Sequence, residues 1–362
     1  MRFAVFRKKG SLLFGLLAGL LLLFSGCSSS SSSGTETDSQ EDGNGLDSSV
    51  TLTILEAGGE SGEYFEEGFI KPFTEKTGIK VLRENPTELG KLQAMVESGQ
   101  STYNLVELSS GNVHQALSKG LIQEIDWDLV DPDPLNEEGM LPYAVGYQYY
   151  STIMAWNEEG EELESWADFW DVERFPGKRS LPDFPVFSLP IALLADGVPK
   201  DELYPLDIDR AFESLEKIKD HVSVWWTSGS QPPQLLMDGE VAYAATWSGR
   251  VVGNNDNIGY TFNEGLLDLS YFVIPKGAKN LKETHALIHE MTLAENQARA
   301  AEVLPYSGPN KELTSLLPQD RLDDFPSSEA NYDKQSLNDP QWWFENSKEV
   351  EERWQLFKLS IQ

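Results

Sequence analysis

Few residues of this chain have the types and spacing that covalent chemistry requires. His285 and His289 stand four positions apart on an expected helix and are followed by Glu290, which is a spacing used at metal sites. No third ligand follows in register, so we expect no metal. The acid pairs within residues 158–162 lie in a charged run that is typical of a solvated loop and not of a glycosidase dyad. Neither a Gly-x-Ser-x-Gly elbow nor a phosphate-binding Gly-x-x-x-x-Gly-Lys-Ser/Thr motif occurs. We therefore expect a protein that is not an enzyme and needs no cofactor.

The single cysteine stands where a lipid could be attached. Cys27 follows an apolar run over residues 11–24, and the nine residues before that run's start carry four cations and no acid. This order is typical of a secretory signal peptide. Small residues at 25 and 26 before a cysteine are typical of bacterial lipoprotein processing, although Phe24 stands where Leu is most common. We expect residues 1–26 to be removed and Cys27 to be acylated. An ordinary signal peptide or a membrane anchor with an incidental cysteine is the alternative.

The net charge argues against a nucleic-acid partner. The chain has 59 acidic and 28 basic residues and a formal charge of −31, whereas phosphate binding requires a basic surface. A negative field favours cationic solutes. Because the acids are spread along the whole chain, we favour an acid-rich surface that aids solubility as their explanation.

Residues 27–49 form an expected tether. Leu46 is the one apolar residue among 28–49, and the rest are mostly Ser, Gly, Asp and Glu. Such a segment cannot bury enough surface to offset its chain entropy. The globular body would then begin near Val50, and no second apolar stretch of membrane-spanning length follows.

The first part of the body alternates strands with helices. Strands are predicted over 50–55, 79–82 and 105–108, and helices over 65–77, 88–97 and 113–119. This order predicts a mostly parallel sheet covered by helices on both faces. Ligands of such sheets bind beyond the carboxyl ends of the strands. The loops at 56–61 and 108–112 are therefore candidate walls of a site, which selects Glu56, Gly58, Ser109 and Ser110.

Further elements are predicted along the rest of the chain. They are strands over 147–157, 241–246 and 271–274, and helices over 165–170 with Ser165 as N-cap, 210–220, 281–302 and 343–359.

Short segments spread over the body resemble the extracellular solute-binding proteins of ABC importers, specifically the spermidine/putrescine branch. Each is weak alone, but their order and spacing together are specific. They are 73–81 (FTEKTGIKV), 103–106 (YNLV), 120–125 (GLIQEI), 165–170 (SWADFW), 175–179 (FPGKR), 238–241 (DGEV), 274–280 (IPKGAKN) and 306–310 (YSGPN).

The resemblance implies an α/β fold of the type II-like periplasmic-binding-protein kind, with two lobes, a hinge and a ligand cleft. One lobe would take residues 50–152 and 261–310, and the other would take 153–260. Residues 311–362 would supply C-terminal helices that pack across both lobes. The implied mechanism is closure of the lobes on a solute, and the permease then recognises the closed state.

The same resemblance assigns ligand contacts. In the polyamine branch, aromatic rings enclose the methylene chain and carboxylates hold the ammonium ends, which is sound cation–π and charge-pair chemistry. Each aromatic residue could equally be a core or hinge residue. The matching positions are Trp226, Trp247, Tyr306, Tyr149 or Tyr150, the acid Asp183 and Ser109.

Three departures from that branch bear on the ligand. The loop after the first strand reads Glu-Ala-Gly-Gly over 56–59 and is nearly empty of side chains, and no second acid follows Asp183 within residues 184–188. Arg250 stands where some polyamine binders have Asp. An arginine repels an ammonium and can grip a carboxylate in bidentate fashion, unless it turns away to pair with an acid such as Asp256 or Glu240. The expected solute is a small amine of the polyamine type, and an amine that also carries a carboxylate, such as an amino acid or a γ-amino acid, is the alternative.

The expected partners follow from these features. They are a small amine, the membrane subunits of a permease and the membrane itself through the lipid anchor, with the chain exported and monomeric. Because Ser28 follows Cys27, the sequence leaves open whether the anchor lies in the periplasm or on the outer face of the cytoplasmic membrane. A membrane-tethered sensor or adhesion module that uses the same fold without transport is the alternative of a different class.

Overall fold

The computed structural model describes residues 45–361, apart from 131–133, 159 and 254–256. The predicted signal peptide, Cys27 and most of the predicted tether lie outside these residues. Among the described residues, the strands form one sheet with the central order β2-β1-β3-β10-β6-β9-β7-β8. The strands are β1 (Thr51–Leu55), β2 (Lys80–Glu84), β3 (Leu105–Ser109), β4 (Ile122–Gln123), β5 (Met140–Leu141), β6 (Ala144–Asn157), β7 (Arg179–Pro182), β8 (Val222–Trp226), β9 (Tyr243–Trp247), β10 (Ile258–Pro275) and β11 (Ser336–Leu337).

The sheet is parallel at its two ends and antiparallel in its middle. Strand β1 is parallel to β2 and β3, and β7 is parallel to β8 and β9. Strand β10 is antiparallel to β3 and to β6, and β6 is antiparallel to β9. The predicted mostly parallel arrangement thus holds within the strand–helix–strand units at each end. The long strands β6 and β10 are antiparallel to each other, and each also pairs antiparallel with its outer neighbour.

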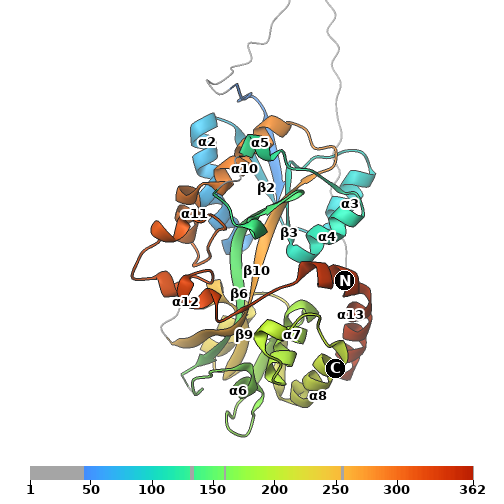
Figure 1. The fold of residues 1–362 in the computed structure, drawn as a ribbon, viewed down its shortest axis with the longest axis vertical. Helices are drawn as coiled ribbons and strands as arrows, with labels where there is room; N and C mark the ends of the chain where they lie inside the picture. The colour runs from blue at the N-terminus through green and yellow to red at the C-terminus, as the bar shows by residue number, and fades with distance from the viewer. Residues whose placement is uncertain (1–44, 131–133, 159, 254–256, 362) are drawn as a thin grey trace, which may run out of the picture. The chain divides into compact units, whose positions relative to one another are not determined.

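Helices cover both ends of the sheet (Figure 1). Of the described helices, none is long and apolar enough to cross a membrane. The α-helices are α1 (Gly59–Phe65), α2 (Lys71–Thr77), α3 (Leu89–Glu97), α4 (Ser110–Ser118), α5 (Trp127–Val130), α6 (Trp166–Trp170), α7 (Pro185–Ala195), α8 (Ile208–Ile218), α9 (Gln231–Met237), α10 (Leu281–Thr292), α11 (Ala294–Ala301), α12 (Glu329–Tyr332) and α13 (Pro340–Ser360).

The helix predicted over 65–77 begins earlier, at Gly59, and includes a π-helical turn over Glu66–Ile70 between α1 and α2. Gly58 has a φ angle of 81°, which side chains with a Cβ rarely adopt, and it turns the chain directly from β1 into α1. The loop expected at 56–61 is therefore shorter, and the first turn of α1 carries Glu60 and Ser61 to the carboxyl end of β1.

The start of α6 is as predicted. The hydroxyl of Ser165 accepts a hydrogen bond from the amide of Asp168, and the side chain of Asp168 accepts one from the amide of Ser165. This reciprocal capping box satisfies amide groups that the first helical turn leaves free.

Strands β6 and β10 run side by side through the middle of the sheet (Figure 1). Their register shifts between Ser270 and Tyr271 and also between Thr261 and Leu266, where Thr261 pairs with Met154 but Leu266 pairs with Thr152. Separate buried clusters lie toward the two ends of this strand pair, one around Trp166, Phe169 and Leu189 and the other around Phe65, Phe69 and Phe272. The shift between Thr261 and Leu266 lies beside the lobe boundaries predicted at 152/153 and 260/261, and that division of the chain remains a prediction.

The long C-terminal helix α13 joins elements from both ends of the sheet. It packs against α4 and against α7, and Figure 1 shows it between α4 and α8. Its inner face buries Trp342, Trp343, Val350, Trp354 and Phe357. Burial of four large aromatic side chains fixes this helix firmly, because each contributes roughly 1.5–3 kcal/mol of transfer free energy.

Candidate functional site

A cavity of about 480 Å³, termed the main cavity, lies at the carboxyl ends of β1 and β3. It occupies the position where open α/β sheets bind ligands. Its walls come from elements on both sides of the β6/β10 pair. They are Ala57, Ser61, Thr87, Glu88, Leu89, Glu107, Leu108, Ser109, Asn112, Gln148, Tyr150, Phe184, Val186, Phe187, Trp247, Arg250, Ser270 and Tyr306.

Glu107 in β3 places a buried carboxyl group on the wall of the main cavity. One of its oxygens accepts a hydrogen bond from the hydroxyl of Tyr147 at 2.8 Å, and the other accepts one from the amide of Ala57 at 2.6 Å. Burial raises the pKa of Glu107 to about 7, with a smaller contribution from Glu56, and the two donors oppose that rise. A ligand ammonium beside this group would favour its charged form.

Arg250 places a cation on the same cavity from the turn after β9. Its side chain is 16% exposed and forms an ion pair with Glu60 of α1. The Nε–H of Arg250 is buried and has no hydrogen-bond partner among the described residues. A buried donor left in this state costs about 1–3 kcal/mol, which an acceptor on a ligand would recover.

Aromatic rings form the apolar part of the wall. Trp247 packs edge-to-face on Trp226 with ring centroids 5.2 Å apart, and it packs in the same manner on Tyr150 at 6.3 Å and Phe187 at 6.1 Å. The indole Nε1–H of Trp247 is also buried without a partner among the described residues. Tyr306 lies between Tyr64 of α1 and Gly249, and burial raises the pKa of its hydroxyl to about 12, which keeps it neutral.

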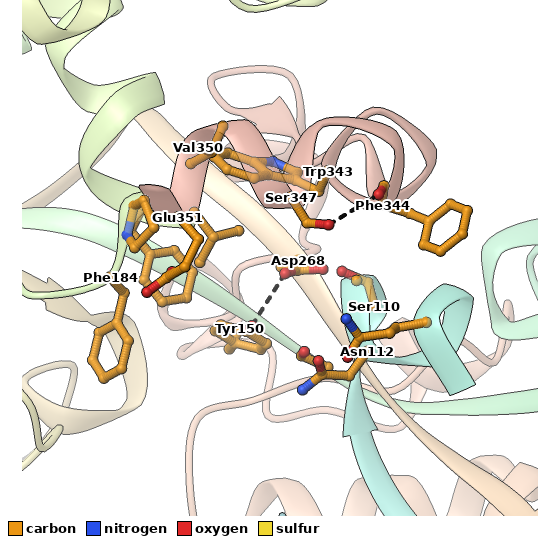
Figure 2. A pocket seen from close by; sticks show the side chains of 16 residues that line it. Ser110, Asn112, Tyr150, Phe184, Asp268, Trp343, Phe344, Ser347, Val350 and Glu351 are labelled. Atoms are coloured by element: carbon orange, nitrogen blue, oxygen red, sulfur yellow. Dashed lines mark hydrogen bonds between the residues drawn. The ribbon is translucent and has the colours of Figure 1, made fainter. Parts of the chain in front are cut away.

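A second cavity of about 270 Å³, termed the adjoining cavity, lies beneath α13. Ser109, Asn112, Tyr150, Phe184, Val186 and Phe187 line both cavities. Figure 2 shows Asp268 in the middle of the adjoining cavity, with Ser110 to one side and Ser347 and Trp343 of α13 above it. The hydroxyl of Tyr150 donates to Asp268 across 3.1 Å, so this side chain links the two cavities.

Six of the residues predicted from the sequence line these cavities. Ser109 and Tyr150 line both, Trp247, Arg250 and Tyr306 line the main cavity, and Ser110 lines the adjoining cavity.

The other predicted residues lie outside the two linings. Glu56 is buried behind the main cavity, where it accepts a hydrogen bond from the amide of Gly58 and faces Arg83 at 3.4 Å. Tyr149 points to the opposite face of β6 from Tyr150, because side chains alternate along a strand, and is buried in the core beside β3.

Asp183 and Trp226 also have internal partners. The carboxylate of Asp183 accepts hydrogen bonds from Trp354 and Lys358 of α13. The indole of Trp226 donates to the carbonyl of Ala245 at 2.8 Å, and its ring supports Trp247 from behind. Trp226 therefore acts on the cavity through Trp247 rather than by contact.

Sequence reasoning missed the three buried polar wall residues that lie inside strands, namely Glu107, Gln148 and Asp268. A signal was available for each, since each is a polar residue inside an otherwise apolar strand and such residues are rarely buried without a partner or a role. The sequence offered Asp256 or Glu240 as an alternative ion-pair partner for Arg250. The observed partner, Glu60, is distant in sequence, and Asp256 lies outside the described residues.

The histidines at the candidate metal spacing are engaged by the backbone. Both ring nitrogens of His285 are used, with Nδ1 bonded to the carbonyl of Leu281 at 2.6 Å and Nε2 accepting from the amide of Asp126 at 2.9 Å. His289 bonds the carbonyl of Val130 at 2.8 Å. Residues 45–361, where described, contain no group of three or more His, Cys, Asp or Glu side chains that could hold a metal ion.

Sequence comparison finds relatives over most of the body. A family model described as bacterial extracellular solute-binding protein matches residues 68–323. A γ-aminobutyric acid-binding protein of Pseudomonas aeruginosa PAO1 is 30% identical over 84% of this chain and 90% of its own length. The spermidine/putrescine-binding periplasmic protein of Escherichia coli K12 is 27% identical over 76% of this chain and 84% of its own.

Solved structures match equally widely. An ABC transporter substrate-binding protein from Bradyrhizobium japonicum USDA 110 is 33% identical, with a TM-score of 0.81, covering 85% of this chain and 99% of that one. The structure of the Atu4243–GABA receptor is 32% identical, with a TM-score of 0.80, covering 85% of this chain and 97% of that one.

Proposed function

Because the chain belongs to the family of bacterial extracellular solute-binding proteins, we propose that its main cavity captures a small amine that also carries a carboxylate, such as an amino acid or a γ-amino acid. The chain is the substrate-binding component of an ABC transporter, with the two-lobe α/β fold expected from the sequence. The closed arrangement of the lobes binds the solute more tightly than the open one, and this difference in affinity shifts the protein toward closure when solute binds. The permease then receives the solute unaltered. No step requires a catalytic group.

One observation carries the choice of ligand, namely the position of Arg250 on the wall of the main cavity. A guanidinium there would repel a purely cationic polyamine and would bind a carboxylate through two parallel hydrogen bonds. Its unpartnered Nε–H supplies one of those donors. Glu107 and the ring of Trp247 lie on the same cavity and supply the charge and the π face that an ammonium requires.

The names of two relatives fit this choice. The relative from Pseudomonas aeruginosa is a γ-aminobutyric acid-binding protein, and the Atu4243 structure is that of a GABA receptor. γ-Aminobutyrate has one carboxylate, which suits Arg250, and one ammonium, which suits Glu107.

A polyamine is the second candidate. Several relatives bind spermidine and putrescine, and the cavity offers Glu107, Glu88 and aromatic walls to such a ligand. In this case Arg250 would remain bound to Glu60 and would contribute no contact to the ligand.

Titration calorimetry with γ-aminobutyrate, putrescine and sucrose separates the candidates, because they differ in charge but each is small and soluble. We expect γ-aminobutyrate to bind, and Arg250→Ala to weaken its binding at least tenfold while leaving putrescine unaffected or tighter. Binding of putrescine alone, or equal losses for both amines in Arg250→Ala, would remove the carboxylate from the proposal. Binding of sucrose alone would overturn the amine class itself.

We also propose that the mature chain is a monomer anchored to a membrane by acylated Cys27. The support is the sequence alone: the basic and apolar start, the small residues before Cys27 and the polar tether after it. Cys27→Ser should release the exported protein from the membrane fraction and abolish labelling by a radioactive fatty acid. A variant that stays in the membrane fraction would instead favour anchoring by the apolar segment.

A further inference from the structure

The adjoining cavity contains a buried carboxylate that the proposed function leaves unused. Asp268 is 7% exposed and lies on the wall of this cavity. Its oxygens accept hydrogen bonds from the amide of Leu269 at 2.8 Å, from the hydroxyl of Tyr150 at 3.1 Å and from the side-chain amide of Asn338 at 3.1 Å. Every one of these partners donates, which is the environment of an ionised carboxylate.

These donors carry no formal charge. Among the described residues, no Lys or Arg forms an ion pair with Asp268, and burial raises its pKa whereas neutral hydrogen-bond donors lower it. A buried charge usually has a counter-charge, because neutral hydrogen bonds replace only part of its lost hydration. An ammonium group in the cavity would supply the counter-charge that Asp268 lacks among the described side chains.

The rest of the lining suits an organic cation. Tyr150, Phe184, Phe187, Trp343 and Phe344 place aromatic side chains around the cavity. The faces of such rings attract ammonium groups, and their apolar edges accommodate the methylene groups that carry them. Carboxylate and rings together point to a cationic nitrogen on an apolar stem, and not to a hydrated metal ion.

We propose that the adjoining cavity is a second subsite for a cationic nitrogen, and that the preferred solute is an amino acid whose side chain carries an additional ammonium from the main cavity to Asp268. This inference rests on the proposed function, because Arg250 must hold the carboxylate end. The shared walls at Ser109, Asn112, Tyr150 and Phe187 provide the continuity that such a solute requires. One carboxylate and two ammonium groups of the solute then match Arg250, Glu107 and Asp268.

Lysine and norleucine test the subsite, because their side chains differ only by the terminal ammonium group. Titration of the wild-type protein should show lysine binding at least tenfold more tightly than norleucine. In Asp268→Asn, which keeps an acceptor oxygen for Leu269 and replaces the oxygen facing Tyr150 by an amide group, the ratio should fall to within about twofold of unity. Glu107→Gln is the matched control: it should weaken both ligands and leave their ratio unchanged.

Ser347→Lys gives the same test without changing Asp268. Ser347 is exposed on α13 at the edge of the adjoining cavity, so a lysine there is compatible with folding and would supply Asp268 with a competing ammonium. We expect this variant to lose the preference for lysine and to keep its affinity for norleucine. If Asp268→Asn does not fold, this variant still decides the question.

The failure of this inference differs from the failure of the proposed function. Equal binding of lysine and norleucine by the wild type, or an unchanged ratio in Asp268→Asn or Ser347→Lys, would overturn the subsite while amino acid binding stands. If no amino acid binds and a diamine does, the proposed function fails. In that case the wild-type protein should bind putrescine more tightly than butylamine. If Asp268→Asn loses this difference in affinity, Asp268 is still supported as an ammonium site. If the variant keeps the difference, the assignment of Asp268 is overturned.

Discussion

The guanidinium of Arg250 is bound to the carboxylate of Glu60, 190 residues away in the sequence. Glu60 lies in the first turn of α1, which follows β1, and Arg250 lies in the turn that follows β9. These strands stand on opposite sides of the central β10/β6 pair. The ion pair therefore crosses the edge of the main cavity and occupies the guanidinium that we assign to the solute.

Glu60→Gln should strengthen the binding of a carboxylate solute. The Glu60 side chain is 56% exposed, and exposed pairs of this kind contribute about 0.2–1 kcal/mol. Removing the competing carboxylate should therefore lower the Kd for γ-aminobutyrate by up to about fivefold, as measured by calorimetry at low salt. Glu63→Gln removes the same charge from an exposed position of the same helix and should have no effect. Weaker binding in Glu60→Gln would mean that Glu60 orients Arg250 for the solute instead of competing with it.

Trp247→Ala should weaken ligand binding by about 1–3 kcal/mol, or roughly five- to 150-fold, if the indole stacks on the bound amine. Trp247→Phe retains a ring face but loses the buried Nε1–H, so the two variants separate stacking from hydrogen bonding. Trp226→Phe is the control, because Trp226 supports Trp247 without lining the cavity. An affinity that Trp247→Ala leaves unchanged would place Trp247 in the core.

The sequence was sufficient for the elements but not for their complete order in the sheet. Patterns of apolar residues and caps predicted most helices and strands, as Ser165 at the start of α6 illustrates. The antiparallel pairing of β10 with β3 and β6 depends on contacts between residues far apart in the sequence, such as Ser270 with Ser109. Local periodicity carries no information about such pairs, because it reports which face of a strand is buried and not which strand lies next to it.

The candidate site was also predictable only in part, because it too depends on contacts between residues far apart in the sequence. Ser109, Tyr150, Trp247, Arg250 and Tyr306 were selected either from strand ends or from resemblance, and the structure brings them to one cavity. Which of two adjacent tyrosines faces the cavity depends on the register of β6, which the sequence left open. The adjoining cavity exists because α13 covers Asp268, and this contact between distant segments has no sequence signature.

Asp183→Asn should lower stability and spare ligand binding. Its carboxylate accepts hydrogen bonds from Trp354 at 3.0 Å and from Lys358, and thereby fixes α13 to the end of β7. Charged hydrogen bonds of this kind contribute about 1.5–3 kcal/mol, so the thermal midpoint of the ligand-free protein should fall by several degrees. Lys358→Met should give a similar fall. A loss of affinity beyond twofold, with the midpoint unchanged, would instead place Asp183 in contact with the solute.

Glu107 should make the folded protein lose stability as the pH rises from about 4.5 to about 7. Burial raises the pKa of Glu107 from its usual value near 4.5 to about 7, so in this interval the folded state retains a proton that the unfolded state has released. Stability then falls with increasing pH, by at most about 1.4 kcal/mol per unit from one group, and levels off above the folded pKa. Glu107→Gln cannot titrate and should lack this component, so its thermal midpoint should fall less than that of the wild type between pH 5 and pH 8. The comparison between the two proteins removes the contribution of all other carboxylates. Parallel midpoint curves would show that Glu107 is already ionised in the folded state, and a solute ammonium beside it would then release no proton on binding at pH 7.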